Sequence, residues 1–379
     1  MKVLFIQKEG GIFGAENYHL NILPVLVKRG ITVHFLRLYT NYQGGEGGDF
    51  VKKLNNIGIK TFEVNIGRFP GLRDLLFVRR VVNEGGYDFV HSHLIHADLY
   101  ISIIKIMFGL SCPWITTKHG YDNSYTSKHG FDPSKQSITL YYLMVKLSEK
   151  LSNKSYTISH GLRNFFIKAN ITQPEKMGMI HYGFDFEETS DRLIDSDFRF
   201  FKQQIVIAGR LVAFKGHKFL LESLTKLMGP FDNVGLVIVG SGEQEAYLRQ
   251  VVEDKNLQSR VRFVGYSKEV SKWMYNSDVV AVPSISEGFG VVFLEAFNCK
   301  KPVVSWDVPS GNEIMENGKS GYLVSPYDTD ALSKQLGEIF ENPEAAKQVG
   351  KNAYDRLKSY FTLNRMVKET VAVYKTLVN

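Results

Sequence analysis

The chain contains, at residues 283–296, the stretch PSISEGFGVVFLEA. A buried apolar strand leads into it, a glycine-rich loop follows, and an apolar helical pattern begins near Gly290. Glu287 precedes that helix and Glu295 lies inside it, so the two carboxylates flank N-terminal amides that have no partner within the helix. This arrangement suits two carboxylates that grip different hydroxyls of one extended ligand. The structural alternatives are a helix cap for Glu287 and an ordinary surface acid for Glu295.

Short apolar runs alternate with longer helical patterns on both sides of this stretch. The alternation predicts parallel strands with crossover helices, and therefore an α/β chain of two Rossmann-like, doubly wound domains. Ligands of such sheets bind beyond the carboxyl ends of the strands, so we expect a cleft where the two domains face each other. The runs that we interpret as strands are Val3–Gln7, Thr32–Arg37, Lys60–Val64, Phe89–Ser92, Trp114–Lys118, Ser155–Ile158, Gly178–His181, Ile205–Ala208, Gly235–Val239, Val261–Val264, Val279–Val282 and Val303–Ser305.

A change in composition separates the two halves of the chain. Over Phe186–Phe200, acidic residues, Ser, Thr and Arg replace the apolar rhythm. We therefore predict an N-terminal domain over residues 1–187, a linker over 188–200 and a C-terminal domain over 201–359. We expect the last helical pattern, residues 360–379, to pack back on the N-terminal domain.

The composition is that of an ordinary globular protein, with 44% hydrophobic and 22% charged residues. Lys2 leads directly into an apolar strand pattern, which does not resemble a secretion signal. The two cysteines lie far apart and form no C-x-x-C pair, which favours a reducing compartment. We expect the protein to act in the cytoplasm, either free or as a peripheral protein at the inner face of the membrane.

The positive charge belongs to the first half of the chain. Residues 1–190 hold 22 Lys and Arg against 16 Asp and Glu, whereas the remainder holds 24 against 23. Such an excess suits anionic partners, and zinc-finger spacing and RNA-recognition signatures are absent, so we expect no nucleic-acid partner. Four arginines, Arg68, Arg73, Arg79 and Arg80, lie near one helical stretch. They suit an anionic membrane surface or a lipid-linked acceptor, and a solvated helix face is the alternative.

Two further loops could cradle phosphate groups. Residues 209–216 read GRLVAFKG at the end of a strand, where Arg210 can fork onto phosphate oxygens and Lys215 adds a point charge. Residues 10–16 read GGIFGAE between the first strand and the first helix, where glycines let backbone amides approach an anion. The alternatives are a solvated loop and a plain strand-to-helix turn. The dinucleotide fingerprint G-x-G-x-x-G is absent.

A metal site is a rival interpretation for one histidine-rich segment. His91 and His93 alternate at a strand end, so both imidazoles point to the same face, and His96 and Asp98 follow closely. The competing interpretation makes the two histidines residues that line the cleft.

The segments 284–296 and 209–216 resemble the signature of retaining glycosyltransferase family four (glycosyl transferases group 1), which has the GT-B architecture. That signature is a glutamate, seven residues and a second glutamate around E-G-F-G. Other motifs of the family match along nearly the whole chain: Gly14–Glu16, Val90–His93, His119-Gly120, Ile180–Asp185, Asp278–Ser284, Pro309–Glu313 and Gly318–Gly321. Two positions depart from it, because Tyr182 stands where the family has Asn and Phe13 replaces the first glycine of G-G-A-E.

The resemblance implies a role for each matching residue. Arg210 and Lys215 would hold a donor diphosphate, Glu295 would bind ribose hydroxyls, and Glu287 would hold the donor sugar. The implied catalytic residues are Glu287, His119, Arg210 and Lys215. The implied substrate-binding residues are Gly11, Gly14, Glu16, His119, Gly209, Arg210, Lys215, Val264, Gly265, Tyr266, Glu287, Gly288, Phe289, Gly290, Val291 and Glu295. Because GT-B enzymes generally use cationic side chains at the diphosphate, we expect no metal and no cofactor.

The resemblance therefore implies a retaining glycosyltransferase. It would move a hexose or an N-acetylhexosamine from a nucleotide-diphosphate sugar to an acceptor glycan, such as a cell-envelope polysaccharide or lipopolysaccharide precursor. The C-terminal domain would bind the donor and the N-terminal domain the acceptor. Two alternatives stay open: a GT-B sugar-nucleotide epimerase, which would turn over without an acceptor, and a degenerate, non-catalytic nucleotide-sugar-binding protein.

Overall fold

The structure is a computed structural model that describes residues 1–8, 14–40, 47–67, 70–185, 195–227, 231 and 233–378. The chain forms two compact units. The N-terminal unit comprises residues 1–122, 132–185 and 363–379, and the C-terminal unit comprises 123–131 and 186–362. The segment 123–131 therefore belongs to the C-terminal unit although it lies in the first half of the sequence. Most of the linker 188–200 lies outside the described residues.

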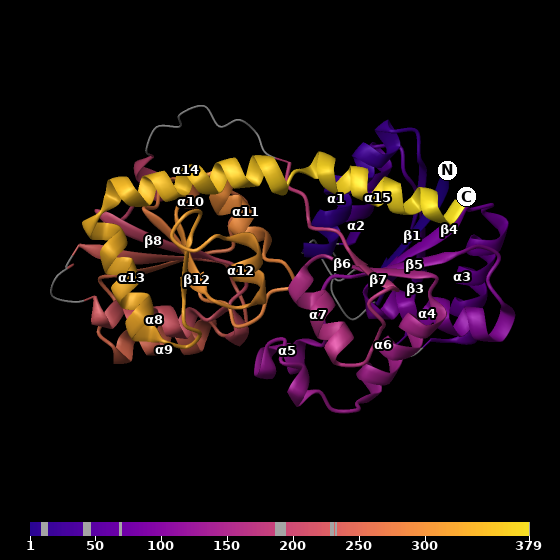
Figure 1. The fold of residues 1–379 in the computed structure, drawn as a ribbon, viewed down its shortest axis with the longest axis horizontal. Helices are drawn as coiled ribbons and strands as arrows, with labels where there is room; N and C mark the ends of the chain where they lie inside the picture. The colour runs from indigo at the N-terminus through magenta and orange to yellow at the C-terminus, as the bar shows by residue number, and fades with distance from the viewer. Residues whose placement is uncertain are drawn as a thin grey trace. The chain divides into compact units, whose positions relative to one another are not determined.

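The N-terminal unit is built on a parallel sheet of seven strands (Figure 1). Their order is β3-β2-β1-β4-β5-β6-β7. Successive strands are therefore added in one direction from β1 to β3 and in the opposite direction from β4 onward, which makes a switch point between β1 and β4. The strands are β1 Lys2–Lys8, β2 Thr32–Tyr39, β3 Lys60–Asn65, β4 Phe89–His93, β5 Trp114–Lys118, β6 Lys154–Thr157 and β7 Met177–Met179. The helices of this unit are α1 Gly14–Lys28, α2 Gly47–Asn56, α3 Leu72–Glu84, α4 Leu94–Phe108, α6 Leu140–Leu151, α7 His160–Lys168 and α15 Leu363–Val378.

The first strand shows why this sheet forms. Val3, Leu4, Phe5 and Ile6 are all fully buried, as expected for a central parallel strand that is covered on both faces. Leu4 and Ile6 belong to a core with α3 and α4. Phe5 points to the opposite face, where its ring lies against histidine rings.

The C-terminal unit has a second parallel sheet, of six strands in the order β10-β9-β8-β11-β12-β13. Its strands are β8 Gln203–Ala208, β9 Val234–Val239, β10 Val261–Gly265, β11 Val279–Val282, β12 Val303–Trp306 and β13 Tyr322–Val324. Its helices are α5 Asn123–His129, α8 His217–Lys226, α9 Glu245–Asp254, α10 Val270–Tyr275, α11 Val291–Asn298, α12 Pro309–Ile314, α13 Thr329–Glu341 and α14 Pro343–Tyr360. The order reverses between β8 and β11, so the loops after these two strands meet at the carboxyl edge.

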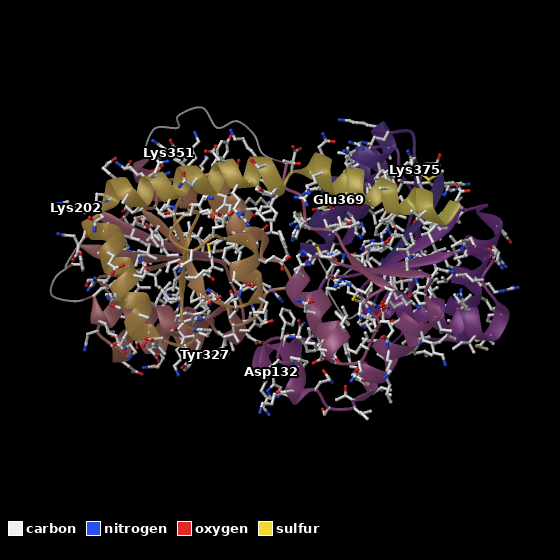
Figure 2. All side chains as sticks on the ribbon, in the orientation of Figure 1. Asp132, Lys202, Tyr327, Lys351, Glu369 and Lys375 are labelled. Atoms are coloured by element: carbon white, nitrogen blue, oxygen red, sulfur yellow. The ribbon has the colours of Figure 1, made fainter. Side chains whose placement is uncertain are left out.

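The two parallel, doubly wound sheets confirm the predicted fold class. The last helix, α15, belongs to the N-terminal unit and contacts α1. Figure 2 shows the side chains on the same ribbon, with Glu369 and Lys375 labelled on α15. None of the helices within the described residues is both long and apolar enough to cross a membrane.

Candidate functional site

Three loops converge at the carboxyl edge of the C-terminal sheet. The loop after β8 touches the loop after β9 so closely that a Cβ atom on Gly240 would lie 1.9 Å from the carbonyl oxygen of Gly209. The amide of Leu211 also donates a hydrogen bond of 2.9 Å to the carbonyl of Ser241. Gly240 has a φ of +143°, in the region that favours glycine. The G-S-G turn therefore positions the candidate phosphate loop.

The loop after β8 is joined equally closely to the loop after β11. Gly216 has a φ of +77°, and a Cβ atom there would lie 1.9 Å from the carbonyl oxygen of Pro283. The amide of Ile285 donates a 2.8 Å hydrogen bond to the carbonyl of Phe214. These backbone contacts bring Lys215 and Glu287 together although they are separated by 72 residues.

Lys215 and Glu287 form the central ion pair of this edge. The ammonium nitrogen of Lys215 lies 2.5 Å from Oε1 of Glu287, and the two side chains are 18% and 10% exposed. Such partial burial strengthens a charge-assisted hydrogen bond relative to one at an open surface. His217, in the next turn, is buried, and burial together with the charge of Lys215 lowers its pKa to about 4.

The helix α11 begins beside this pair. Gly290, its N-cap, has a φ of +88° and no side chain that could cap the first-turn amides of Val291 and the next residue. Phe289 is buried, and its ring lies 5.8 Å from the ring of Phe361. Glu295 is half-buried one turn into the helix; burial raises the pKa of its carboxyl, and Lys215 opposes that shift. Gly288 lies between Glu287 and this helix start.

The remaining candidates of this unit lie on the neighbouring loops. Arg210 is exposed, one residue after Gly209. Val264 and Gly265 end β10, where the carbonyl of Gly265 accepts a 2.8 Å hydrogen bond from the amide of Gly240. Tyr266 follows and is 74% exposed, which suits stacking against a flat ring. The C-terminal unit thus gathers cations, carboxylates and an aromatic ring along one sheet edge.

In the N-terminal unit, four histidines form a cluster near the carboxyl ends of β4 and β5. The rings of His19 and His91 each lie 4.3 Å from the ring of His93, measured between centroids. His93 Nδ1 and His119 Nε2 are 2.8 Å apart and share a hydrogen bond. Burial lowers the pKa of His119 to about 4 and that of His91 to about 3. His119 is therefore a neutral hydrogen-bonding group at neutral pH.

Because of this cluster, we expect the free energy of unfolding to fall as the pH falls. A histidine in the unfolded chain has a pKa near 6.5, whereas burial lowers the pKa of His91 in the fold to about 3. Its contribution is complete above about pH 6.5 and is lost as the pH falls toward 3, because the unfolded state binds more protons there. We expect the His91→Gln variant to show a slope of unfolding free energy against pH that is smaller by up to about 1.4 kcal/mol per pH unit. Urea titrations from neutral to acidic pH measure this slope, and an unchanged slope would contradict the assignment.

The predicted phosphate loop of this unit is only partly described. Gly11 lies outside the described residues, and Gly14 begins α1 at an exposed position. Glu16 is buried, and its Oε1 accepts a 2.7 Å hydrogen bond from Nε2 of Gln7. Gln7 in turn is 2.8 Å from His19. The carboxylate of Glu16 therefore has a partner inside the unit.

The four side chains of the rival metal site have other partners. His91 contacts the hydroxyl of Tyr374 at 2.7 Å and that of Thr117 at 2.8 Å. His96 lies 3.5 Å from the ammonium group of Lys8. His93 shares its hydrogen bond with His119. Asp98 accepts hydrogen bonds from Ser92, Thr116 and Lys118.

Sequence reasoning missed a buried ion network in this unit. Lys118, at the end of β5, lies 2.5 Å from Asp98 of α4 and 3.4 Å from Glu149 of α6. All three side chains are at most 5% exposed. The attraction of the two carboxylates raises the Lys118 pKa, although burial alone would lower it. No local pattern signals this network, because its members lie on three separate elements.

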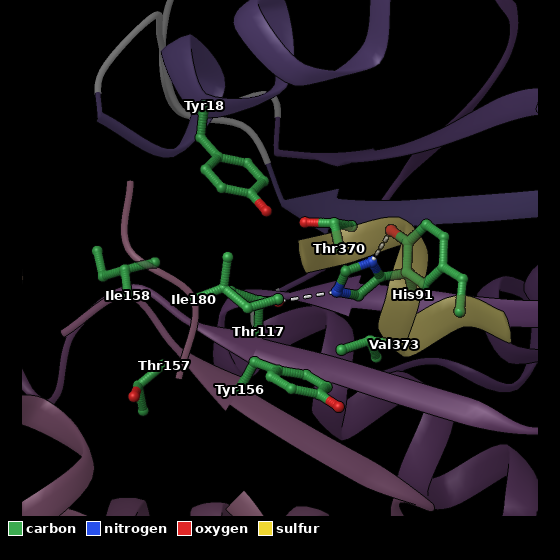
Figure 3. Close-up of a pocket in the computed structure, with 10 residues that line it drawn as sticks. Tyr18, His91, Thr117, Tyr156, Thr157, Ile158, Ile180, Thr370 and Val373 are labelled. Carbon is green, nitrogen blue, oxygen red and sulfur yellow. Dashed lines mark hydrogen bonds between the residues drawn. The ribbon is translucent and has the colours of Figure 1, made fainter. Parts of the chain in front are cut away.

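A small cavity lies beside the histidine cluster (Figure 3). Its volume is about 10 Å³, the room that one water molecule needs. Tyr18 and His91 line it together with Thr370, Val373 and Tyr374 of α15. The hydrogen bond of Tyr374 to His91 fixes the last helix against the sheet, a contact that sequence patterns do not show.

Two family models match the chain, and together they cover most of it. Residues 196–356 match Glycosyl transferases group 1, and residues 12–188 match Glycosyltransferase Family 4. The chain is 23% identical over 371 residues to N-acetyl-alpha-D-glucosaminyl L-malate synthase of Bacillus anthracis, across 92% of this chain and 90% of that protein. It is 22% identical over 388 residues to the UDP-Gal:alpha-D-GlcNAc-diphosphoundecaprenol alpha-1,3-galactosyltransferase of Escherichia coli, across 95% and 96% of the two chains.

A solved structure shares the whole fold. The crystal structure of HepE from Anabaena in complex with UDP superposes with a TM-score of 0.81, at 22% identity and over 100% of both chains. Both halves of the chain thus match models of one enzyme family, and the two sheets match the GT-B fold. The chain belongs to glycosyltransferase family four and is a glycosyltransferase of GT-B architecture.

Proposed function

We propose that the protein is a retaining glycosyltransferase that moves a hexose or an N-acetylhexosamine from a UDP-sugar to a lipid-linked precursor of a cell-envelope glycan. The observation that carries this proposal is the ion pair of Lys215 and Glu287, 2.5 Å apart beside the start of α11. A cation and a carboxylate on adjacent loops suit a donor whose diphosphate is anionic and whose sugar offers hydroxyls. UDP is chosen because HepE was solved with UDP and the E. coli relative is named for UDP-Gal.

Each part of the donor has a candidate partner. Lys215 and Arg210 bind the diphosphate, and the first-turn amides of α11 add partial positive charge. Glu287 holds hydroxyls of the sugar, and Glu295 holds those of the ribose. Tyr266 lies beside the base, next to Val264 and Gly265.

The proposed acceptor side rests on chemistry of the N-terminal unit. His119 is neutral at physiological pH, so it suits a hydrogen bond to a sugar hydroxyl better than a pairing with phosphate. The E. coli relative is named for a diphosphoundecaprenol acceptor, and a Campylobacter jejuni relative is named for a diphospho-undecaprenol acceptor. A lipid-linked acceptor also fits the positive charge of this half of the chain.

A thermal-shift screen tests the donor assignment. A nucleotide that binds only the folded protein raises its stability by mass action. UDP and UDP-sugars are expected to raise the melting temperature more than GDP or ADP compounds. Transfer to an undecaprenyl-diphosphate-linked sugar is then measured with the best donor. Donor turnover without any acceptor that yields an epimerised nucleotide sugar would identify an epimerase instead.

Lys215→Met is expected to weaken UDP binding. A charge-assisted contact contributes about 1.5–3 kcal/mol, which corresponds to about a 10–100-fold change in Kd. Lys218→Met serves as the matched control, because Lys218 lies three residues further on and is half exposed beside Glu222. Calorimetric titration with UDP measures both variants. Equal affinities for wild type and Lys215→Met would remove Lys215 from the diphosphate site.

The product is expected to keep the anomeric configuration of the donor. When the bond between the anomeric carbon and the diphosphate oxygen breaks, Arg210 and Lys215 hold the departing diphosphate. We propose that this oxygen accepts the proton of the attacking hydroxyl, which approaches on the same face of the sugar. Such a front-face step needs no covalent glycosyl-enzyme. The anomeric coupling constant of the first-formed product, measured by NMR, tests this. An inverted product would require a carboxylate or His119 as general base.

A further inference from the structure

Exposed aliphatic side chains gather on one helical layer of the N-terminal unit. Of the residues that the structure describes, every predominantly exposed Leu, Ile or Met lies on α3, α4, α6 or just before α6. Ile138, immediately before α6, is 79% exposed, and Leu140 at its start is 70% exposed. Monomeric proteins rarely expose large contiguous apolar patches, so such a patch indicates an interaction surface.

The three helices form a continuous layer. Helix α3 contacts α4, and α4 contacts α6 (Figure 1). The Lys105 ammonium at the end of α4 donates a 2.7 Å hydrogen bond to the carbonyl of Leu151 at the end of α6. The buried network of Lys118, Asp98 and Glu149 joins α4 and α6 to the strand β5 on their sheet-facing sides. Buried charged contacts therefore join two of the three helices to the sheet.

Helix α6 shows that the exposed side chains form a face. Leu140, Leu143 and Leu147 recur at intervals of three and four residues, so they lie on one side of the helix. Residues Tyr142 and Val145 pack toward the core on the other side. The three leucines are therefore not core residues.

The charge beside this face is positive. Lys146 and Lys150 are exposed next to the leucines, and the acid of this helix, Glu149, is buried against Lys118 and Ser155. On α3, Arg73 and Arg80 are exposed near Leu72 and Leu76, and Arg80 lies 3.9 Å from the carboxylate of Glu84. Arg68 of the predicted arginine cluster lies outside the described residues, and Arg79 lies with its guanidinium 5.1 Å from the ring of Phe108.

We propose that this layer, the α3–α4–α6 surface, docks onto an anionic lipid bilayer. Aliphatic side chains enter the acyl boundary while the flanking cations bind lipid phosphates. A second copy of the chain would bring the same positive charge and be repelled. Protein interfaces are enriched in aromatic residues, whereas the large apolar side chains here are aliphatic except Phe108. The proposal goes beyond the proposed function and is tested without turnover, so either can fail alone.

Flotation of the full-length chain with vesicles tests the proposal. One set is phosphatidylcholine alone, and the other is equal parts phosphatidylcholine and phosphatidylglycerol. The wild type is expected to float with the anionic vesicles at low salt and to be released by high salt. The triple variant L140S/L143S/L147S and the double variant K146E/K150E are each expected to bind at least about tenfold more weakly.

The matched control is K347E/K351E, which reverses two exposed lysines four residues apart on α14 of the other unit. It is expected to float like the wild type. The variant L143W places an additional tryptophan on this surface. Brominated lipid quenches the fluorescence of that tryptophan if the residue enters the bilayer. Y360W, at an exposed position on α14, is its control. No flotation of the wild type at low salt, or equal flotation of the leucine variant, overturns the proposal. An acidic protein partner at this surface would give the first of these results.

Discussion

Replacing Lys118 with Met is expected to lower the free energy of unfolding by about 3–5 kcal/mol. The lysine is the cation between two buried carboxylates, 2.5 Å from Asp98 and 3.4 Å from Glu149. Methionine fills similar volume but leaves both carboxylates without a charge partner in the interior, where ions are costly. Urea denaturation measures the loss. Lys60→Met, at an exposed site on β3, is the control and should change stability by less than about 0.5 kcal/mol.

Acid should partly rescue the Lys118→Met variant. Without the lysine, each buried carboxylate would be an uncompensated charge in the interior, which is costly. Protonation at low pH removes that charge and with it the cost. The stability difference from the wild type should therefore shrink below about pH 5. The triple variant K118M/D98N/E149Q, which removes all three charges together, should recover most of the loss; no recovery would mean that shape rather than charge dominates.

The same residue shows what a sequence cannot reveal. In the sequence, Lys118 is the last residue of the expected strand Trp114–Lys118, and nothing in that run marks its side chain as buried. Its burial depends on an aspartate 20 residues earlier and a glutamate on another helix. Local patterns carry no information about such pairings. The carboxylate of Glu16, expected among the substrate-binding residues, likewise has a buried partner in Gln7.

The fold itself was accessible because periodicity is local. The apolar runs, with changes of one or two residues at their ends, correspond to the seven strands of the first sheet and to five of the second. The strand β13 was missed, since its three residues, Tyr322–Val324, are too few to show a pattern. The short helix α5 was also missed. It packs against the turn Ala213–Lys215 of the C-terminal unit, and nothing in its own sequence indicates that it belongs to that unit.

The candidate donor site was partly accessible for a different reason. Its glycines mark places where the backbone must approach closely, and the structure uses Gly216 in that way, packed against the carbonyl of Pro283. That contact brings together two loops whose charged residues, Lys215 and Glu287, the sequence motifs identify only separately. Their direct ion pair could not be foreseen, since it depends on the geometry of both loops.

Glu287→Gln is expected to reduce kcat by about 10²–10³ while leaving the fold intact. The amide keeps the size of the side chain but loses the negative charge that orients the sugar hydroxyls in the proposed site. Glu269→Gln is the matched control, because Glu269 is an exposed acid of the same unit beside Lys272. Single-turnover rates with saturating donor separate the chemical step from binding.

Nucleotide binding should respond in the opposite direction. The ammonium of Lys215 lies 2.5 Å from the carboxylate of Glu287, so the carboxylate competes with an incoming diphosphate for that cation. Removing its charge should leave UDP affinity unchanged or make it tighter, although the rate collapses. Combining E287Q with K215M completes a double-mutant cycle, in which contacting charges are expected to couple by about 0.5–3 kcal/mol. A parallel loss of UDP affinity and rate in E287Q would mean that Glu287 holds the loop in shape, because a residue that orients only the sugar cannot weaken binding of a nucleotide without one.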